Sequence, residues 1–438
     1  MLLAVEYTIQ AVIFVTQVAP IGTNIGLVRV VWVMLNGSFL RSRGAIFPAL
    51  LLNGFSVEEI RRSWAAFHNG SWKIGDLLEV WHIYVARQNE WRANHYAGLQ
   101  VVSVDITGFW RPRLQGWASK HFHHMIGKAV PAVVMGVLVT SGTIGGKRIP
   151  LLQGVLRCKT ETNEAKFRVE LLKKAAARPG NQEVKVMDAG FKSSEIHAAG
   201  LKGYVVRMAN NCTARRNQLP VYKGRGRHPE YGEYVRPLAR KHGTNEIPAS
   251  APDQTSQFSH NGRAIEVHSW ANLLDTNTKV CPGAPTFSIH VFFDPAYKKP
   301  LVLATDLSIS VQNAYLIYKD RWPVEQPPLA AKQMIGLHRQ FVFSEDACYR
   351  LPELALLAGN ILTYVAGVLP AIPSGFWDRQ PVATPGRLRR LLATADFPNL
   401  AASYPELRKK NSITAHLPKG VDAHRRHKRP TSPRNTGN

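Results

Sequence analysis

Residues 318–332, with the sequence YKDRWPVEQPPLAAK, are the most informative stretch of the chain. Four polar side chains lie three, four and seven positions apart in it: Tyr318, Arg321, Glu325 and Lys332. An α-helix turns by about 100° per residue, so these side chains would lie within roughly 60° of one another on a helix. That face would combine a carboxylate, two cations and a phenol. Because carboxylates bind hard divalent cations and cations bind phosphates, the stretch predicts a metal site beside a polyanion.

Three prolines surround the glutamate of this stretch: Pro323, Pro327 and Pro328. Proline removes a helical hydrogen bond and usually kinks the helix. We therefore expect an interruption before Glu325 and a restart near Gln326, with Pro327 in the first turn of the new helix. The arrangement on one helical face would then hold only approximately.

The composition of the chain indicates a polyanionic partner. Its 438 residues suggest two or three domains, and its hydrophobic content of 45% is that of a globular protein. Lys and Arg number 55 against 30 acidic residues, which gives a net charge of +25. Such an excess favours nucleic acid as the partner, while a basic surface without a specific partner is the alternative. The four cysteines form no CxxC pair, which argues against a zinc ribbon and a disulfide-stapled secreted domain.

The first 95 residues are predicted to be mainly helical. Ser56 and Glu59 form a capping box that opens one helix, and Asn69-Gly70 would end it. Ser71 would start the next helix. Two such helices with basic residues fit either a helix-turn-helix that binds DNA or a plain helical pair. The uncharged residues 7–28 contain several polar residues and a proline, so we expect a packing segment there and no membrane span.

From residue 99 onward the pattern changes to that of an α/β protein. The run LQVVSVD is a strand that would end at Asp105, and two further strand-like runs follow it. TNEAKFRVELLKKAAA is an amphipathic helix that Pro179-Gly180 would end, and VKVMD is a strand that would end at Asp188. A further helix and the strand GYVVRMA follow. This order is that of a ribonuclease H-like fold, which is an α/β layer architecture.

The remaining segments complete the predicted organisation. Residues 209–300, rich in Arg, Gly and Pro, would form a β-rich insertion, with FSIHVFF and LVLAT as its last strands or re-entering the parent sheet. LPELALLAGNILTYVAGVL would be an apolar helix closing the core, and HRRHKRPTSPRNTGN a disordered basic tail that binds phosphates nonspecifically. The predicted divisions are a helical N-terminal domain (residues 1–95), the first segment of a catalytic core (96–208), the insertion (209–300), the rest of the core (301–370) and a C-terminal region (371–438).

Three carboxylates are the candidates for chemistry: Asp105, Asp188 and Glu325. Hydrolysis of a phosphodiester needs an activated water and a stabilised leaving oxygen, and two Mg²⁺ ions about 3.5–4 Å apart can provide both. Neighbouring carboxylates repel one another, so without a metal one pKa of the aspartate pair would rise. Three acidic side chains that converge on one edge of a sheet would therefore suit a divalent metal site.

Three motifs together resemble those of bacterial insertion-sequence transposases of the Asp-Asp-Glu (DDE) class. They are VVSVDITGF around Asp105, VMDAGF around Asp188 and YKDRWPVE with its downstream Lys332. The last is similar to the Tyr-x2-Arg-x3-Glu-x6-Lys (YREK) signature of one such group, and the resemblance covers roughly residues 99–360. It implies a ribonuclease H-like catalytic core with a β-rich insertion. It also implies that Asp105, Asp188 and Glu325 hold two Mg²⁺ or Mn²⁺ ions.

The resemblance further implies roles for side chains that contact DNA. Tyr318, Arg321 and Lys332 would bind phosphates near the cleaved transposon end. Trp322 and Trp270 are candidates for holding a flipped base, with plain packing as the alternative for both.

The function that these expectations imply is DNA transposition. The enzyme would cleave DNA strands at insertion-sequence ends and join them to target DNA. It would bind terminal inverted repeats as a homodimer in a synaptic complex, in the bacterial cytoplasm near the nucleoid and away from any membrane. One alternative is a catalytically inactive DNA-binding protein derived from a transposase, in which the prolines misplace the triad. Another is a basic RNA-binding protein, although the chain lacks the aromatic pattern of the commonest RNA-binding sheet.

Overall fold

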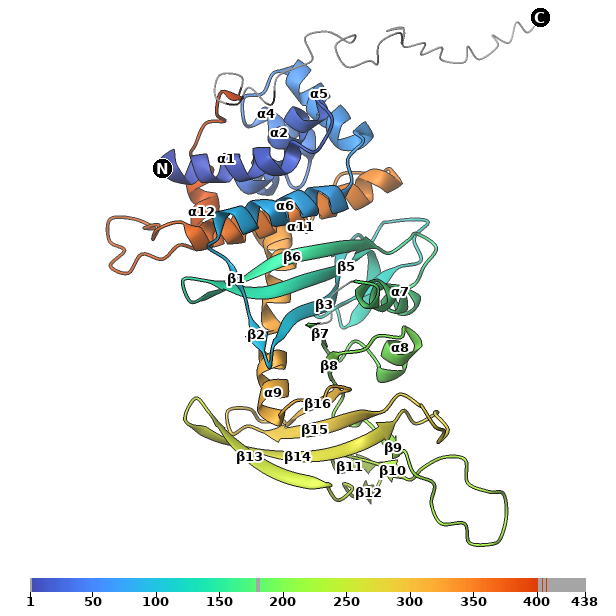
Figure 1. The fold of residues 1–438 in the computed structure, drawn as a ribbon. Helices are drawn as coiled ribbons and strands as arrows, with labels where there is room; N and C mark the ends of the chain where they lie inside the picture. Colours follow the sequence, from blue (N-terminus) through green and yellow to red (C-terminus); the bar gives the residue numbers. More distant parts are fainter. Residues whose placement is uncertain (1, 179–181, 401–403, 405–406, 408–438) are drawn as a thin grey trace, which may run out of the picture.

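The computed structural model describes residues 2–178, 182–400, 404 and 407. It is a mixed α/β protein in which a layer of helices lies at one end, and a strand-rich region lies at the other (Figure 1). The α/β class expected from the sequence is therefore confirmed. The predicted basic tail and the predicted helix stop at Pro179-Gly180 lie outside the described residues.

The N-terminal region is helical, as predicted. Its helices are α1 (Leu2–Thr16), α2 (Thr23–Leu35), α3 (Ser38–Arg41), α4 (Ile46–Leu51), α5 (Val57–Asn69) and α6 (Ile74–Gln88). The capping box is present, because the Ser56 side chain accepts the Glu59 backbone N–H and the Glu59 side chain accepts that of Ser56. The predicted start at Ser71 is wrong, since α6 begins at Ile74. Trp72 explains why α6 begins later than predicted. Its buried indole donates to the carbonyl of Ala66 at 3.1 Å and connects this segment to α5.

Helix α11 (Glu345–Val368) closes the core, as its apolar sequence predicts. It contacts helices α1, α2, α5, α6 and α12 (Pro385–Leu392) and the strands β5 and β6 described below. Among the described residues it is the helix that is long and apolar enough to cross a membrane. However, 89% of its most apolar window is buried inside the protein, as expected of a core helix.

One large sheet organises the rest of the chain. Its central strands are β3 (Leu99–Trp110), β5 (Lys128–Ile144), β6 (Lys147–Arg157), β7 (Glu183–Met187) and β8 (Tyr204–Arg207), and the short β1 (Arg92–Ala93), β2 (His95–Tyr96) and β4 (Lys120–His123) pair at its margins. The central order is β6-β5-β3-β7-β8. The pairs β6–β5 and β5–β3 are antiparallel, whereas β3–β7 and β7–β8 are parallel. Helix α7 (Glu164–Ala176) joins β6 to β7, and helix α8 (Ser193–Ala198) joins the parallel strands β7 and β8.

Residues 209–300 add strands to the same sheet. These are β9 (Ala214–Arg216), β10 (Tyr234–Val235), β13 (Gln254–His260), β14 (Arg263–Leu274) and β15 (Phe287–Phe293), while β11 (Arg240–His242) and β12 (Asn245–Ile247) form a separate hairpin. Strand β16 (Leu301–Thr305) pairs antiparallel with both β15 and β8. LVLAT therefore re-enters the parent sheet, and the insertion and the core share one continuous sheet within the described residues.

The stretch around Glu325 is a run of short helical pieces. They are α9 (Val311–Lys319), the 3₁₀ turn η1 (Trp322–Glu325), α10 (Gln326–Leu329) and the π-helix η2 (Ala330–Met334). The restart at Gln326 with Pro327 in the first turn is as predicted. Asp320, at the end of α9, fixes the run to the sheet, because Ser141 Oγ donates to its carbonyl at 2.6 Å and Asn94 donates to its carboxylate at 2.8 Å.

Candidate functional site

Asp105 lies in the middle of β3, not at the end of the strand as predicted. The strand continues through ITGFW because apolar and small side chains keep alternating beyond the carboxylate. Alternation puts residues 103, 105, 107 and 109 on one face. That face is turned toward the run of short helical pieces, since Lys332 Nζ donates to Thr107 Oγ1 at 2.7 Å and lies 5.4 Å from the centre of the Phe109 ring.

The register of the parallel strands brings the two aspartates together. Ser103 of β3 pairs with Val186 of β7, so the same register two residues later aligns Asp105 with Asp188. Asp188 directly follows β7, as predicted. The turn that begins there is closed by the backbone N–H of Phe191, which donates to the carbonyl of Asp188 at 3.1 Å.

Arg321 connects all three predicted carboxylates. Its guanidinium lies 3.7 Å from the nearest carboxylate oxygen of Asp105, 3.7 Å from that of Asp188 and 2.9 Å from that of Glu325. Its side chain is only 8% exposed. Residues from the middle of one strand, the end of another and a 3₁₀ turn thus meet at one cation.

The charges of this cluster shift one another's protonation. Burial, and then the nearby charges of Glu325 and Asp188, raise the pKa of Asp105 to about 6, although Arg321 and the Ile106 N–H oppose the rise. Burial lowers the pKa of Arg321, but the charges of Asp188 and Asp105 outweigh it and raise that pKa overall. Burial is thus the main cause that disfavours the charged form of Asp105, and Arg321 is the main group that opposes it.

The other two predicted phosphate-binding side chains border this cluster. The Tyr318 hydroxyl donates to Asp188 at 3.1 Å. Lys332 lies in the π-helix, a geometry that often occurs at functional sites. Burial lowers the pKa of Lys332 to about 8, while the charge of Asp105 opposes that effect. The four residues predicted from their spacing therefore all border the aspartates, although the helix between them is broken.

Two contributors to the site were not predicted from the sequence. Arg207 lies 3.6 Å from Asp188, and Thr107 holds Lys332. The positions of both residues follow from the register and the alternation of the strands. Met187 pairs with Val206 in the parallel ladder, so Arg207 follows in register with Asp188. Thr107 is two residues beyond Asp105 and so shares its face of β3.

A cationic cleft of about 710 Å³ opens beside the carboxylates. Its cations include residues of the core and of the loop between β15 and β16: Arg148, Arg207, Lys298, Lys299, Lys319 and Arg321. Trp322 also lines it, and 62% of that residue is exposed, so its ring is accessible to a ligand. Trp270 is 1% exposed, and its indole donates to the carbonyl of Ala251 at 2.8 Å. The interpretation of Trp270 as a base-binding residue is therefore wrong, and packing explains it.

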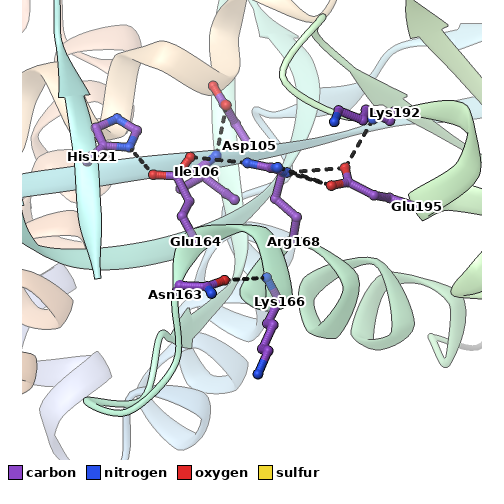
Figure 2. Close-up of polar contacts among 9 residues, drawn as sticks. All are labelled: Asp105, Ile106, His121, Asn163, Glu164, Lys166, Arg168, Lys192 and Glu195. Carbon is purple, nitrogen blue, oxygen red and sulfur yellow. Dashed lines mark hydrogen bonds and ion pairs between the residues drawn. The ribbon is translucent and has the colours of Figure 1, made fainter. Parts of the chain in front are cut away.

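The opposite face of the sheet is covered by α7 and α8. Figure 2 shows Arg168 of α7 bonded to Glu195 of α8, with the shortest contact at 3.0 Å, and His121 bonded to Glu164 at 2.9 Å. The carboxylate of Asp105 points away from this network (Figure 2). The network thus holds the two helices against one face of the sheet, while the Asp105 side chain lies on the other face.

The donor set suits a hard divalent cation. Asp105, Asp188 and Glu325 supply carboxylate oxygens, the ligands that Mg²⁺ and Mn²⁺ prefer. In this structure the Arg321 guanidinium lies among these oxygens. Within the described part of the chain, no group of three or more His, Cys, Asp or Glu side chains is arranged to hold a metal ion as it stands.

No protein-family model and no curated protein matches this chain.

Proposed function

We propose that this chain is a DDE transposase that cleaves DNA strands at insertion-sequence ends and transfers them to target DNA. The observation that carries the proposal is the meeting of Asp105, Asp188 and Glu325 at the Arg321 guanidinium. These carboxylates come from distant parts of the chain and stand in the order that the motifs require.

The topology supports a ribonuclease H-like core for this enzyme. Three antiparallel strands, β6, β5 and β3, are followed in the sheet by the parallel β7 and β8. One helix, α7, precedes β7 and another, α8, precedes β8. In open sheets of this kind, ligands bind at the carboxyl ends of parallel strands, where Asp188 and Arg207 lie.

The chain's own residues would position the DNA backbone. Arg321, Lys332 and the cations of the cleft would bind non-bridging phosphate oxygens, and partial burial strengthens such contacts. Lys332 has a pKa of about 8, so it is mainly charged at neutral pH and can donate to a phosphate. When bound by Asp105, Asp188 and Glu325, Mg²⁺ or Mn²⁺ would supply activation of water and stabilisation of the leaving oxygen.

The partners that follow from this function are the terminal inverted repeats and the target DNA. A homodimer would hold the two transposon ends together. A cytoplasmic location would give the enzyme access to the bacterial chromosome. The net charge of +25 supports a polyanionic partner.

Nicking of supercoiled plasmid tests the proposal. The plasmid carries the DNA that flanks this reading frame, and the full chain is incubated with it in Mg²⁺, in Mn²⁺ or in EDTA. We expect metal-dependent nicking by the wild type and a loss of at least a hundredfold in Glu325→Gln. Glu246→Gln, which changes an exposed acid of β12, is the matched control and should cleave normally.

One observation favours a second function, that of a DNA-binding protein without cleavage. Arg321 already contacts all three carboxylates, so the cluster has a counterion without any metal. Wild-type protein that binds the plasmid ends but leaves them intact in both metals would favour this second function over the first.

A further inference from the structure

The loop between β9 and β10 carries a basic tip that the proposed catalytic site does not use. Its residues 221–228, VYKGRGRH, are all exposed, and Val221 is 89% exposed. In Figure 1 it is the long green loop that extends from the strand-rich end. Three cations alternate there with two glycines: Lys223, Gly224, Arg225, Gly226 and Arg227.

The tip is narrow and its base is closed. Gly224 and Gly226 have φ of 78° and 86°, a region that favours glycine, and no atom lies within 4 Å of where a Cβ would stand on either. The rings of Tyr222 and His228 stack with centres 4.0 Å apart, and the Tyr222 hydroxyl donates to the Gly226 carbonyl at 2.9 Å. The two sides of the loop are therefore held together behind a tip without side-chain bulk at the glycines.

The charges at this tip differ in how they are paired. Arg227 contacts Glu230 at 2.5 Å, and Lys279 also contacts Glu230, at 2.9 Å. In the part of the chain that the structure describes, no acidic side chain pairs with Lys223 or Arg225. These two cations are therefore available to an external polyanion.

We infer that this tip enters the minor groove of A·T-rich duplex DNA, with Arg225 as its central contact. The minor groove is about 6 Å wide and the major groove about 12 Å, so the major groove suits a helix or a ribbon and the minor groove suits a thin strand. Narrow A·T-rich minor grooves carry an enhanced negative potential that attracts arginine. The exocyclic amine of guanine projects into the minor groove and would obstruct the tip.

Duplex RNA fits this tip less well. Its minor groove is wide and shallow, and its major groove is too narrow for side chains to read. The inference depends on the proposed function only for its ligand, duplex DNA, and it does not depend on the carboxylates.

Binding of the full-length wild type in EDTA tests the inference without cleavage. Fluorescence anisotropy would compare duplexes that differ only in a central block of A·T, G·C or inosine·C pairs. Inosine lacks the minor-groove amine of guanine but keeps its major-groove atoms. We expect A·T and inosine·C duplexes to bind alike, and the G·C duplex to bind about tenfold more weakly.

Variants show whether the loop is responsible. Arg225→Ala should remove the preference and weaken A·T binding about tenfold, whereas Lys173→Ala, which removes an exposed cation of α7, should keep the preference. Gly226→Ala keeps every charge but thickens and strains the tip, so it should lose the preference and retain salt-dependent binding.

Three outcomes would overturn the inference. They are equal binding of the three duplexes, identical behaviour of Arg225→Ala and Lys173→Ala, and tighter binding of duplex RNA. Selective binding by a protein that never nicks DNA would sink the proposed cleavage and leave the loop assignment intact.

Discussion

Arg321 determines the electrostatics of the candidate site at the scale of single residues. Its side chain is 8% exposed, whereas those of its three carboxylate partners are 30–39% exposed. Removing one member of a buried ion pair destabilises a protein by about 3–5 kcal/mol, because the remaining charge stays buried. Here partial exposure of the carboxylates reduces that penalty.

Arg321→Gln should therefore destabilise the metal-free protein by about 2–3 kcal/mol. Three repelling carboxylates would remain together without their counterion. Added Mg²⁺ should stabilise this variant more than it stabilises the wild type. Urea denaturation in EDTA and in Mg²⁺ measures both effects.

Arg207→Gln is the control for that experiment. Arg207 is 46% exposed and contacts only Asp188 among the carboxylates, so its loss should change stability by about 0.5 kcal/mol or less. Equal stability of Arg321→Gln and wild type in EDTA would contradict the role assigned to Arg321.

The spacing of Tyr318, Arg321 and Glu325 was sufficient to predict that they border one site. The middle position of Asp105 in β3 was not predicted, because a run of apolar residues followed by a carboxylate looks the same at a strand end. Arg207 was missed because its importance depends on the register of β7 and β8 and not on its neighbours in the sequence.

At the scale of elements, one buried side chain joins α11, α6 and β6. Asn360 is fully buried, and its amide oxygen accepts the Trp81 indole N–H at 2.9 Å and the Leu152 N–H at 3.0 Å. Its amide nitrogen donates to the Pro150 carbonyl at 2.7 Å. A single amide thus satisfies polar groups from a helix and a strand that would otherwise be unpaired in the core.

Asn360→Leu should destabilise the protein by about 3–5 kcal/mol, because it leaves three buried polar groups without partners. Thr363→Val on the same helix removes only one hydrogen bond, to the carbonyl of Gly359. It should lower the stability of the protein by about 1 kcal/mol. Thermal and urea denaturation compare the two. Similar losses for both variants would show that Asn360 does not connect the layers as described.

Strand β15 contains a histidine that makes the stability of the insertion depend on pH. His290 Nδ1 lies 2.9 Å from Ser269 Oγ, and burial lowers the pKa of His290 to about 4. The folded state therefore binds a proton less readily than the unfolded state, whose histidine pKa is near 6.5. This contribution to stability is complete above pH 6.5 and is lost as the pH falls toward 4.

Between pH 7 and pH 4.5, the free energy of unfolding of the wild type should fall by about 2 kcal/mol more than that of His290→Gln. Urea denaturation of both proteins across that range measures the difference. Parallel curves for the two proteins would contradict a neutral, partly buried His290.

The whole molecule combines a net charge of +25 with a cleft that concentrates part of it. Lys298 and Lys299 lie on the loop between β15 and β16, at the wall of the cleft that the insertion supplies. If the cleft binds DNA as proposed, its phosphate contacts would release counterions, and the affinity for DNA would fall as the salt concentration rises.

Replacing Lys298 and Lys299 with Ala should weaken DNA binding uniformly across sequences. It should also reduce the slope of log affinity against log salt by about 2, one for each phosphate contact. The matched double variant Lys173→Ala with Lys174→Ala, on α7, should leave the slope nearly unchanged. Titrations at several salt concentrations measure it, and identical slopes for the two double variants would exclude the cleft as the DNA path.

The sequence predicted the α/β class, the helical N-terminal region and the closing role of α11, because local periodicity and composition determine these features. It did not determine how the strands of residues 209–300 attach to the core. Whether β16 pairs with β8 depends on contacts between residues about a hundred positions apart, and no local pattern reports such a contact.

The pairing of β8 with β16 has a consequence for shortened copies of this gene. Met208 N–H donates to the Val302 carbonyl at 2.8 Å, and Val205 and Val206 lie fully buried in the same ladder. A deletion of residues 209–305 would remove β16, with which β8 pairs, and would expose an apolar strand edge to water. Such edges recruit other chains, so truncated gene products should aggregate instead of surviving as small DNA-binding fragments.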